Sequence, residues 1–208
     1  PKIITRLNKY NYSMGVRRSF RKLKTMKKNI FFLLLFFFTI SFNFAQERFA
    51  TKSGIINFEA SVPSFEEVKA THNSVSAILK SNGDFASLAL VRGFRFKVAL
   101  MEEHFNESYV ESSKYPKATF SGKIKDFNSS ELSGVQKDYI LLGTVSMHGK
   151  EKKIETTVNL KEIDNIIYLT TSFTLRPEDF NIEIPSIVSN KIAEEINIST
   201  YFELRTNF

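Results

Sequence analysis

The chain has 208 residues, a length typical of one domain with an appended segment. It contains no Cys, which excludes disulfides, thiolate metal sites and a cysteine nucleophile. The formal net charge of +7 suggests a nucleic-acid partner, but residues 1–46 hold ten Lys or Arg and no acidic residue. The remainder has 19 basic and 22 acidic residues, so it lacks the global basic field that attracts nucleic acid.

Residues 26–45 have the layout of a secretory signal peptide. Met26 opens the segment MKKNIFFLLLFFFTISFNFA, in which two lysines precede the apolar run Ile30–Ile40 and the small Ala45 comes last. An apolar run of this length is short for a helix that crosses a bilayer. We therefore predict cleavage after Ala45 or Gln46 and a periplasmic or secreted location. An uncleaved membrane anchor is the alternative.

Residues 1–25 precede this signal and give only weak motif matches. The chain begins with Pro1, so we expect Met26 to be the initiator and residues 1–25 to be an over-extended, disordered start. Arg17–Lys22 resembles a twin-arginine export motif, and Met14–Ser19 fits a myristoylation pattern. Both patterns are short enough to occur by chance.

From Glu47 onward, apolar and polar residues alternate with period two, which predicts half-buried strands. The candidate strands are Gly54–Val62, Ser74–Lys80, Phe85–Val91, Phe94–Leu100, Ala118–Lys125, Tyr139–Met147, Ile154–Lys161, Ile166–Leu175 and Ile196–Leu204. Turn signals such as Asn82-Gly83-Asp84, His148-Gly149 and Asp164-Asn165 separate them. Eight or nine short strands with one polar face predict an all-β antiparallel sandwich or barrel.

Two stretches break the alternation. Met101–Tyr115 is predicted to form a helical turn or a long loop. Arg176–Asn190 contains Pro177 and Pro185, so it is predicted to form a loop over one end of the sheet. No internal repeat or second domain boundary is visible, and we predict a single domain over residues 46–208.

Motifs for catalysis are missing from the sequence. It has no P-loop, no G-x-G-x-x-G and no G-x-S-x-G, so an enzyme has no positive support and we predict no catalytic residue and no cofactor. Glu102, Glu103, His104 and Glu107 are close enough in sequence to build a metal site. A carboxylate cluster on a loop is more often solvated surface, so we predict no metal.

The aromatic residues give a stronger signal. After residue 46 the chain holds 13 Phe, many of them on strand faces expected to point inward. One interpretation is an ordinary packed core. The other is the wall of an apolar cavity, because an eight-stranded barrel is either filled by its side chains or holds one small ligand. The alternation is the same in both cases.

Three segments resemble the YceI family of secreted, lipocalin-like proteins. They are His104–Gly122 (HFNESY, then YPKATFSG), Gly143–Lys150 (GTVSMHGK) and Glu178–Ile182 (EDFNI), and their order and spacing agree with the family over about Ser53–Leu204. The resemblance implies an antiparallel, lipocalin-like β-barrel of about eight strands with one short helix or helical loop. It also implies export, and a lumen that holds a polyprenol or an isoprenoid quinone.

The resemblance has one departure. Family members carry R-D-x-H-L where this chain has Met101–Phe105, so Met101 replaces an Arg expected beside a polar head group. We predict an exported carrier for an isoprenoid lipid, with no catalysis, no nucleic-acid partner and no stable membrane insertion after signal cleavage. A homodimer stays open. The alternatives are a stress-related or interaction module with a packed core and, ranked last, an enzyme acting on a lipid-like substrate.

The predicted lumen contacts combine the alternation with this resemblance. They are Phe58, Phe85, Phe94, Phe96, Val98, Phe120, Leu142, Val145, Phe173 and Phe180. His104 and His148 are predicted polar contacts near the lumen mouth, or residues that satisfy turn backbone. An error of one residue in a strand would turn its whole inward set outward.

Overall fold

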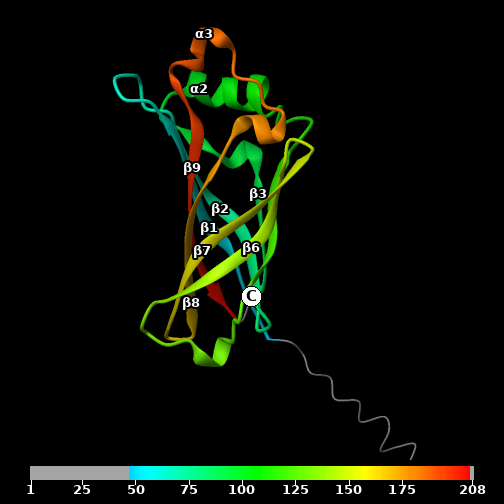
Figure 1. Cartoon of the computed structure of the whole chain (residues 1–208), viewed down its shortest axis with the longest axis vertical. Coiled ribbons are helices and arrows are strands. Elements are labelled where there is room, and N and C mark those ends of the chain that lie inside the picture. Colours follow the sequence, from blue (N-terminus) through cyan, green and yellow to red (C-terminus); the bar gives the residue numbers. More distant parts are fainter. Residues whose placement is uncertain (1–46, 207–208) are drawn as a thin grey trace, which may run out of the picture. The chain divides into compact units, whose positions relative to one another are not determined.

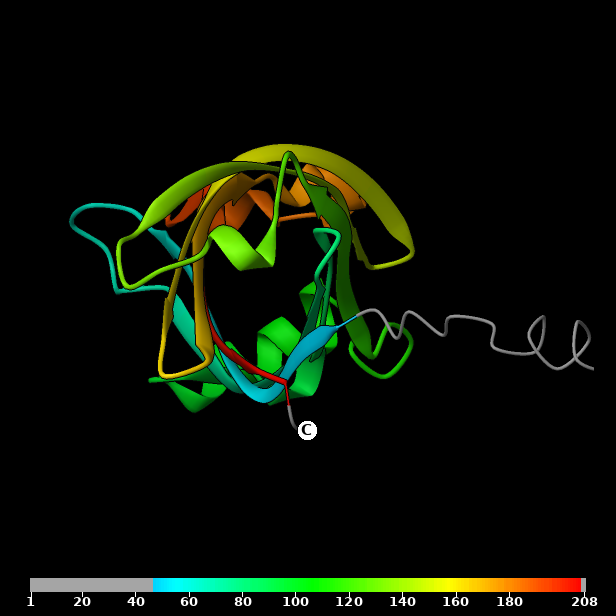
Figure 2. The same ribbon diagram turned by 90° about the horizontal axis from the view of Figure 1, so that it is seen from below.

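The computed structural model describes residues 47–206, which form a closed antiparallel barrel. The predicted signal peptide and residues 1–25 lie outside the described residues. The strands are β1 (Arg48–Ser61), β2 (Lys69–Lys80), β3 (Asp84–Leu90), β4 (Arg95–Phe96), β5 (Lys117–Ile124), β6 (Lys137–Met147), β7 (Lys150–Ile163), β8 (Ile166–Leu175) and β9 (Ile192–Arg205). Strand β1 pairs with both β9 and β2 and thereby closes a ring of eight strands, which Figure 2 views from one end. The predicted fold class is confirmed.

The helical segments divide between the two ends of the barrel. They are η1 (Val91–Gly93), α2 (Ala99–His104), the π-helical η2 (Phe105–Tyr109), η3 (Ser129–Glu131), η4 (Pro177–Phe180) and α3 (Ser186–Ser189). All except η3 follow strands that run toward one end, the helical end, where Figure 1 shows α2 and α3. The β2–β3 hairpin, η3 and the β7–β8 turn form the basal end. No helix within residues 47–206 is long and apolar enough to cross a membrane.

The predicted turns join neighbouring strands of the ring. His148 and Gly149 join β6 to β7, and Asp164 and Asn165 join β7 to β8. All four residues have positive φ, between 52° and 72°. Two-residue hairpins require this conformation, because it matches the right-handed twist of the flanking strands. The turn signals therefore fix where these strands begin and end.

The predicted strand Phe94–Leu100 is wrong for most of its length. Only β4 is extended and paired, to Ala70 and Thr71 of β2. The carboxylate of Glu102 accepts hydrogen bonds from the backbone N–H of Phe96 at 3.1 Å and from Arg95 at 3.0 Å, which folds the chain back into α2. The two stretches predicted to break the alternation are confirmed. Met101–Tyr115 is largely helical, and Arg176–Asn190 lies over the helical end of the barrel.

Three phenylalanine rings divide the barrel interior. The rings of Phe202 on β9 and Phe85 on β3 have centroids 5.7 Å apart, and Phe85 and Phe120 of β5 are 5.9 Å apart. Because β1 and β2 lie between β9 and β3 in the ring, the contact of Phe85 with Phe202 reaches across the interior, while Phe120 extends it from the neighbouring strand β5. We call Phe85, Phe120 and Phe202 the aromatic partition.

Glycines on the strands make room for the partition. A Cβ at Gly54 of β1 would overlap the ring of Phe202. A Cβ at Gly122 or at Gly143, which face each other across β5 and β6, would overlap the ring of Phe120. Glycine within a strand marks such a close approach, and here it lets a large ring lie flat against the barrel wall.

The interior between the partition and the basal end is filled by side chains. Its fully buried residues include Leu79, Ile124, Leu160, Ile167, Leu169 and Leu204. They come from strands on all sides of the ring, so they meet at the barrel axis. The packed-core interpretation therefore describes the basal half of the barrel, whereas the helical half contains a cavity.

Two substitutions of the same kind distinguish these halves. Ile167→Ala removes a fully buried side chain from the packed half, and we expect it to lower the free energy of unfolding by about 2–5 kcal/mol. Ile198→Ala acts beside the existing cavity, so we expect a loss of only about 1 kcal/mol. Urea unfolding followed by circular dichroism measures both. Equal losses would contradict a division into packed and hollow halves.

Candidate functional site

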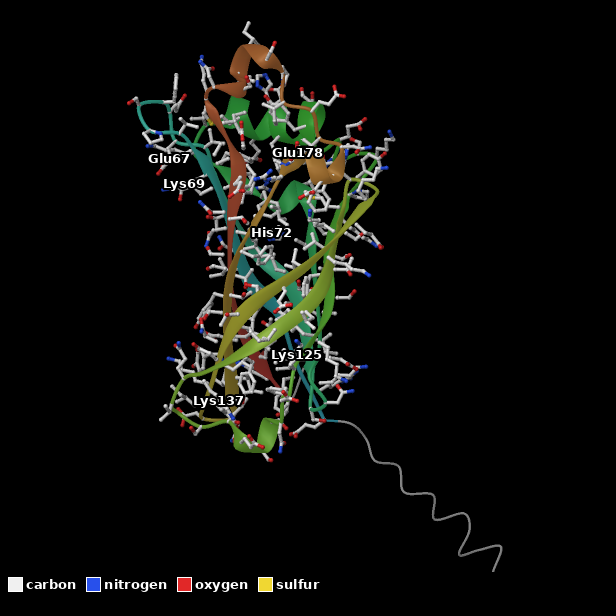
Figure 3. All side chains as sticks on the ribbon, viewed as in Figure 1. Glu67, Lys69, His72, Lys125, Lys137 and Glu178 are labelled. Carbon is white, nitrogen blue, oxygen red and sulfur yellow. The ribbon has the colours of Figure 1, made fainter. Side chains whose placement is uncertain are left out.

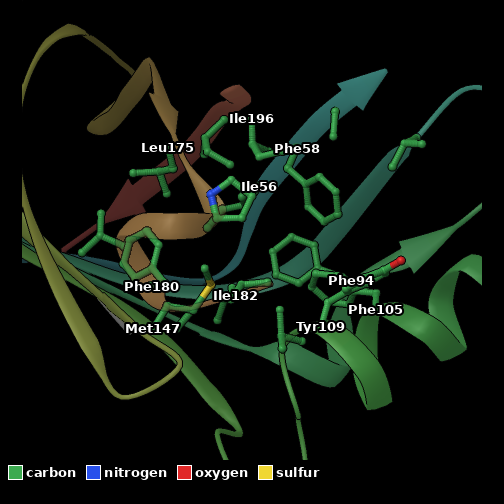
Figure 4. A pocket seen from close by; sticks show the side chains of 18 of the residues that line it. Ile56, Phe58, Phe94, Phe105, Tyr109, Met147, Leu175, Phe180, Ile182 and Ile196 are labelled. Atoms are coloured by element: carbon green, nitrogen blue, oxygen red, sulfur yellow. The ribbon is translucent and has the colours of Figure 1, made fainter. Parts of the chain in front are cut away.

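The helical half of the barrel encloses a cavity of about 480 Å³. Its walls are the inward faces of the strands, and Figure 4 shows Ile56, Phe58, Leu175 and Ile196 around it. The aromatic partition forms its floor. Ligand pockets in proteins typically measure about 300–1,000 Å³ and are mostly apolar, so this cavity has the size and lining of a binding site.

Segments at the helical end complete the cavity. Phe180 of η4 is fully buried, and Ile182 follows it into the lining. Val188 of α3 also lines the cavity, whereas its neighbour Ile187 points outward and is 82% exposed. The exposed residue Phe65, in the β1–β2 loop, lies on the cavity rim. The cavity therefore meets solvent at the helical end.

Four phenylalanines form a continuous wall beneath α2. Phe58 of β1 contacts Phe94, Phe96 of β4 and Phe105 of η2, and ring centroids within the group are 5.1–5.8 Å apart. Tilted, edge-on and offset contacts of this kind suit aromatic pairs. The short β4 strand and the helical segment after it therefore serve to bring Phe96 and Phe105 onto the same wall.

A buried histidine supports this wall from outside the cavity. His72 lies on β2, part way along the barrel (Figure 3), and its ring edge packs on Phe94 with centroids 5.3 Å apart. Its Nδ1 accepts a hydrogen bond from the N–H of Ser74 at 3.1 Å, so Nε2 carries the proton and donates to the carbonyl of Leu90 at 3.0 Å. Burial lowers the pKa of His72, because the charged ring would lose hydration.

His148 holds the part of the lining that η4 contributes. Its Nδ1 donates to the carbonyl oxygen of Phe180 at 2.8 Å, and its Nε2 lies 3.0 Å from a carboxylate oxygen of Glu111. The ring of Tyr115 packs on it edge-on at 4.4 Å. His148 thus fastens η4 to the segment after η2. It does not line the cavity, so its role is that of the predicted backbone partner.

Charged side chains in the lining come from the helical end. They are Glu66 of the β1–β2 loop, Arg176 before η4 and Lys191 before β9, and the exposed His104 joins them. Arg176 pairs with Glu195 at 2.7 Å. Figure 3 likewise places Glu67 and Glu178 at this end of the barrel. Ions are thus confined to the rim, where water hydrates them.

The acidic residues spaced closely enough in sequence for a metal site lie in α2 and η2, and one of them has a structural role. Glu102 binds Arg95 and the backbone of Phe96, while Glu103 and Glu107 are exposed. Within residues 47–206, no three His, Cys, Asp or Glu side chains are grouped so that they could hold a metal ion.

Most of the predicted lumen residues lie in the cavity lining. Those that line it are Phe58, Phe85, Phe94, Phe96, Phe120, Val145, Phe173 and Phe180, together with His104. Their contact with a ligand stays a prediction.

Val98 and Leu142 lie outside the lining, which corrects two expected positions. Leu141, Gly143 and Val145 occupy the inward positions of β6, so Leu142 points away from the lumen. Val98 precedes α2, where the chain has already left β4. Aliphatic residues on the same inward faces also line the cavity, and the aromatic pattern in the sequence offered no signal for them. These are Ile56, Met147, Leu175, Ile196 and Ile198.

Comparison with known proteins gives one family and several similar folds. The family model described as YceI-like domain matches residues 36–204. A polyisoprenoid binding domain from Saccharophagus degradans aligns with a TM-score of 0.68 at 13% identity, covering 77% of this chain and 99% of the other. Burkholderia cenocepacia BcnA aligns with a TM-score of 0.61 at 14% identity, covering 74% and 96%. At such identities the likeness concerns the fold, and no curated protein matches the chain.

The burial of His72 predicts a pH-dependent stability. Its folded pKa is lowered from the ordinary value of 6.5, so the unfolded chain binds the proton more readily. The stabilisation is present above pH 6.5 and is lost as the pH falls below it. We expect His72→Gln to flatten the pH dependence of urea unfolding between pH 5 and 7. Identical slopes for wild type and His72→Gln would contradict this.

The close packing of the Phe120 ring on Gly143 gives a second prediction. Gly143→Ala forces the Phe120 ring toward the cavity, so we expect it to lower the free energy of unfolding by about 1–3 kcal/mol. Gly134→Ala is the matched control, since its Cβ would meet only the carbonyl oxygen of Glu162, at 4.0 Å. Urea unfolding of both variants measures the difference. A loss at Gly143 no larger than at Gly134 would rule out the close contact.

Proposed function

We propose that the chain, which belongs to the YceI-like domain family, is an exported carrier that sequesters an isoprenoid lipid in its barrel. The cavity above the aromatic partition is the observation that carries this proposal. A similar structure and a prediction from the sequence support it. The similar structure from Saccharophagus degradans is a polyisoprenoid binding domain, and the sequence has a predicted signal peptide at residues 26–45.

The energetics of the cavity suit such a ligand. Burying one CH₂ group contributes about 0.8 kcal/mol, so an apolar chain of many carbons gains several kcal/mol on leaving water. The barrel wall is built from strands that hydrogen-bond to one another around a closed ring. Little conformational entropy is therefore lost on binding, which favours affinity.

The proposed function requires no chemical step. A carrier needs a dry interior and an opening, and both are provided by apolar side chains. The charged lining residues Glu66, Arg176 and Lys191 lie on the rim rather than around a point inside the cavity. We therefore propose a binding protein without catalysis, whose mature domain is residues 46–208.

Native mass spectrometry of the exported protein tests the proposal. We expect a fraction of the purified protein to carry an additional mass that organic extraction identifies as a polyprenol or an isoprenoid quinone. An apo mass that remains unchanged after incubation with both lipid classes would contradict the carrier function. The same spectra report the oligomeric state, and with it the homodimer.

A filled cavity provides the matched variant. The chain has no Trp, so Ile196→Trp both occupies the cavity and introduces a unique fluorophore. We expect it to reduce lipid retention at least tenfold, because about 1.4 kcal/mol of lost burial has this effect. The outward neighbour Asn197→Trp should retain lipid as the wild type does. Equal retention by the two variants would place the lipid outside this cavity.

A further inference from the structure

Hydroxyl side chains lie near the floor of a mostly apolar cavity. Ser87 of β3, Thr171 of β8 and Thr200 of β9 all line it. Thr171 and Thr200 are direct cross-strand partners. We call these three residues the hydroxyl belt.

The register of the strands places the belt at one depth. Phe85 and Phe202 contact each other across the interior as part of the aromatic partition. Ser87 is the next inward residue after Phe85 toward the helical end, because successive inward residues are two apart. Thr200 stands in the same relation to Phe202 on the antiparallel β9. Because Ser87 pairs directly with Phe120 of β5, the belt lies beside Phe120 and one inward position above Phe85 and Phe202.

Part of the hydrogen-bonding capacity of the belt is unused. Within the described part of the chain, the Thr200 hydroxyl is buried without a partner. The Thr200 oxygen is covered by neighbouring protein atoms, although Thr200 lines the cavity. Rotation about its Cα–Cβ bond exchanges the oxygen with the methyl group. The Thr171 hydroxyl donates to the carbonyl of Thr157 at 2.7 Å and lies 3.3 Å from the Thr156 hydroxyl, so one lone pair is left to accept a further hydrogen bond. Buried polar groups without partners are few in native proteins, so this one calls for an explanation.

The belt lies far from any ion in the lining. Glu66, Arg176 and Lys191 are all at the helical end, and no charged residue lines the floor of the cavity within residues 47–206. A charged group at the floor would lose its hydration with no counter-charge. A neutral polar group can instead exchange hydrogen bonds with the belt hydroxyls.

We propose that the hydroxyl belt binds a neutral hydrogen-bonding head group, an alcohol or a carbonyl, with the apolar chain directed toward the helical end. The proposal rests on the proposed carrier function and specifies its ligand. The lipid then enters head first. An anionic lipid phosphate is rejected at the floor by the cost of desolvation, although the same apolar chain fits the walls.

Three probes with the same C20 isoprenoid chain test the belt: the alcohol, the hydrocarbon and the monophosphate. We measure their dissociation constants by quenching of Ile184→Trp, a single fluorophore on the cavity rim. We expect the alcohol to bind about fivefold more tightly than the hydrocarbon for each hydrogen bond gained, and the monophosphate to bind more weakly than the alcohol.

Variants of the belt then identify the cause. In Ser87→Ala/Thr200→Val we expect the preference for the alcohol over the hydrocarbon to disappear while hydrocarbon affinity is retained. Ser199→Ala, on the outer face beside Thr200, is the control and should keep the preference. The two single variants are measured separately in case the double variant folds poorly. Thr200→Val should also raise the Tm of the empty protein by about 2–4 °C, because it removes an unpaired hydroxyl.

The outcomes separate the belt from the carrier function. A wild-type protein that binds alcohol and hydrocarbon equally, or a preference that survives the double variant, overturns the belt and leaves the carrier function standing. Failure of all three probes to bind overturns the carrier function itself. Tighter binding of the monophosphate than of the alcohol would move the head group to the cationic rim and also overturn the belt.

Discussion

The structure depends on the contact of Phe85 with Phe202 across the barrel, extended by Phe120. An eight-stranded barrel has an interior of fixed width, so three rings that meet inside it separate one end from the other. Toward the basal end, branched aliphatic side chains fill the remaining width and stabilise the closed ring. Toward the helical end, the inward side chains of opposite strands do not fill the interior, and a cavity remains. Stability and binding are thus assigned to different halves of one sheet.

The sequence was sufficient for the strands because alternation and turn chemistry are local. Residues such as Ile154 to Leu160 lie in a long strand as expected, and the His148-Gly149 turn ends one. Prediction failed where a tertiary contact overrode the alternation. Phe94–Leu100 alternates like a strand, but the carboxylate of Glu102 binds the backbone of Phe96 and folds the segment back. Leu142 failed for another reason, since a shift of one residue reverses the face that a strand presents.

The cavity itself could not be derived from the alternation. Ile167 and Ile198 are both isoleucines on inward faces of adjacent strands. Ile167 is fully buried in the packed half, whereas Ile198 lines the cavity. The difference arises from what each side chain meets across the barrel, and this depends on register around the whole ring. Thr171 and Thr200 are similar, because threonine suits either face of a strand and their position above the partition is visible only in the folded chain.

The placement of polar groups limits what the cavity can hold. Water reaches the rim, so ions there cost little, whereas the enclosed floor suits only polar groups that find partners. The floor is therefore expected to select among ligands mainly by excluding charged head groups. A neutral head group gains only a few-fold in affinity from hydrogen bonds, but a charged one loses all of its hydration. Met101 lines this cavity where the family resemblance implied an arginine, so the cations of the lining are Arg176 and Lys191 at the rim. Charge in the lining is therefore confined to the rim, and the floor is left to neutral side chains.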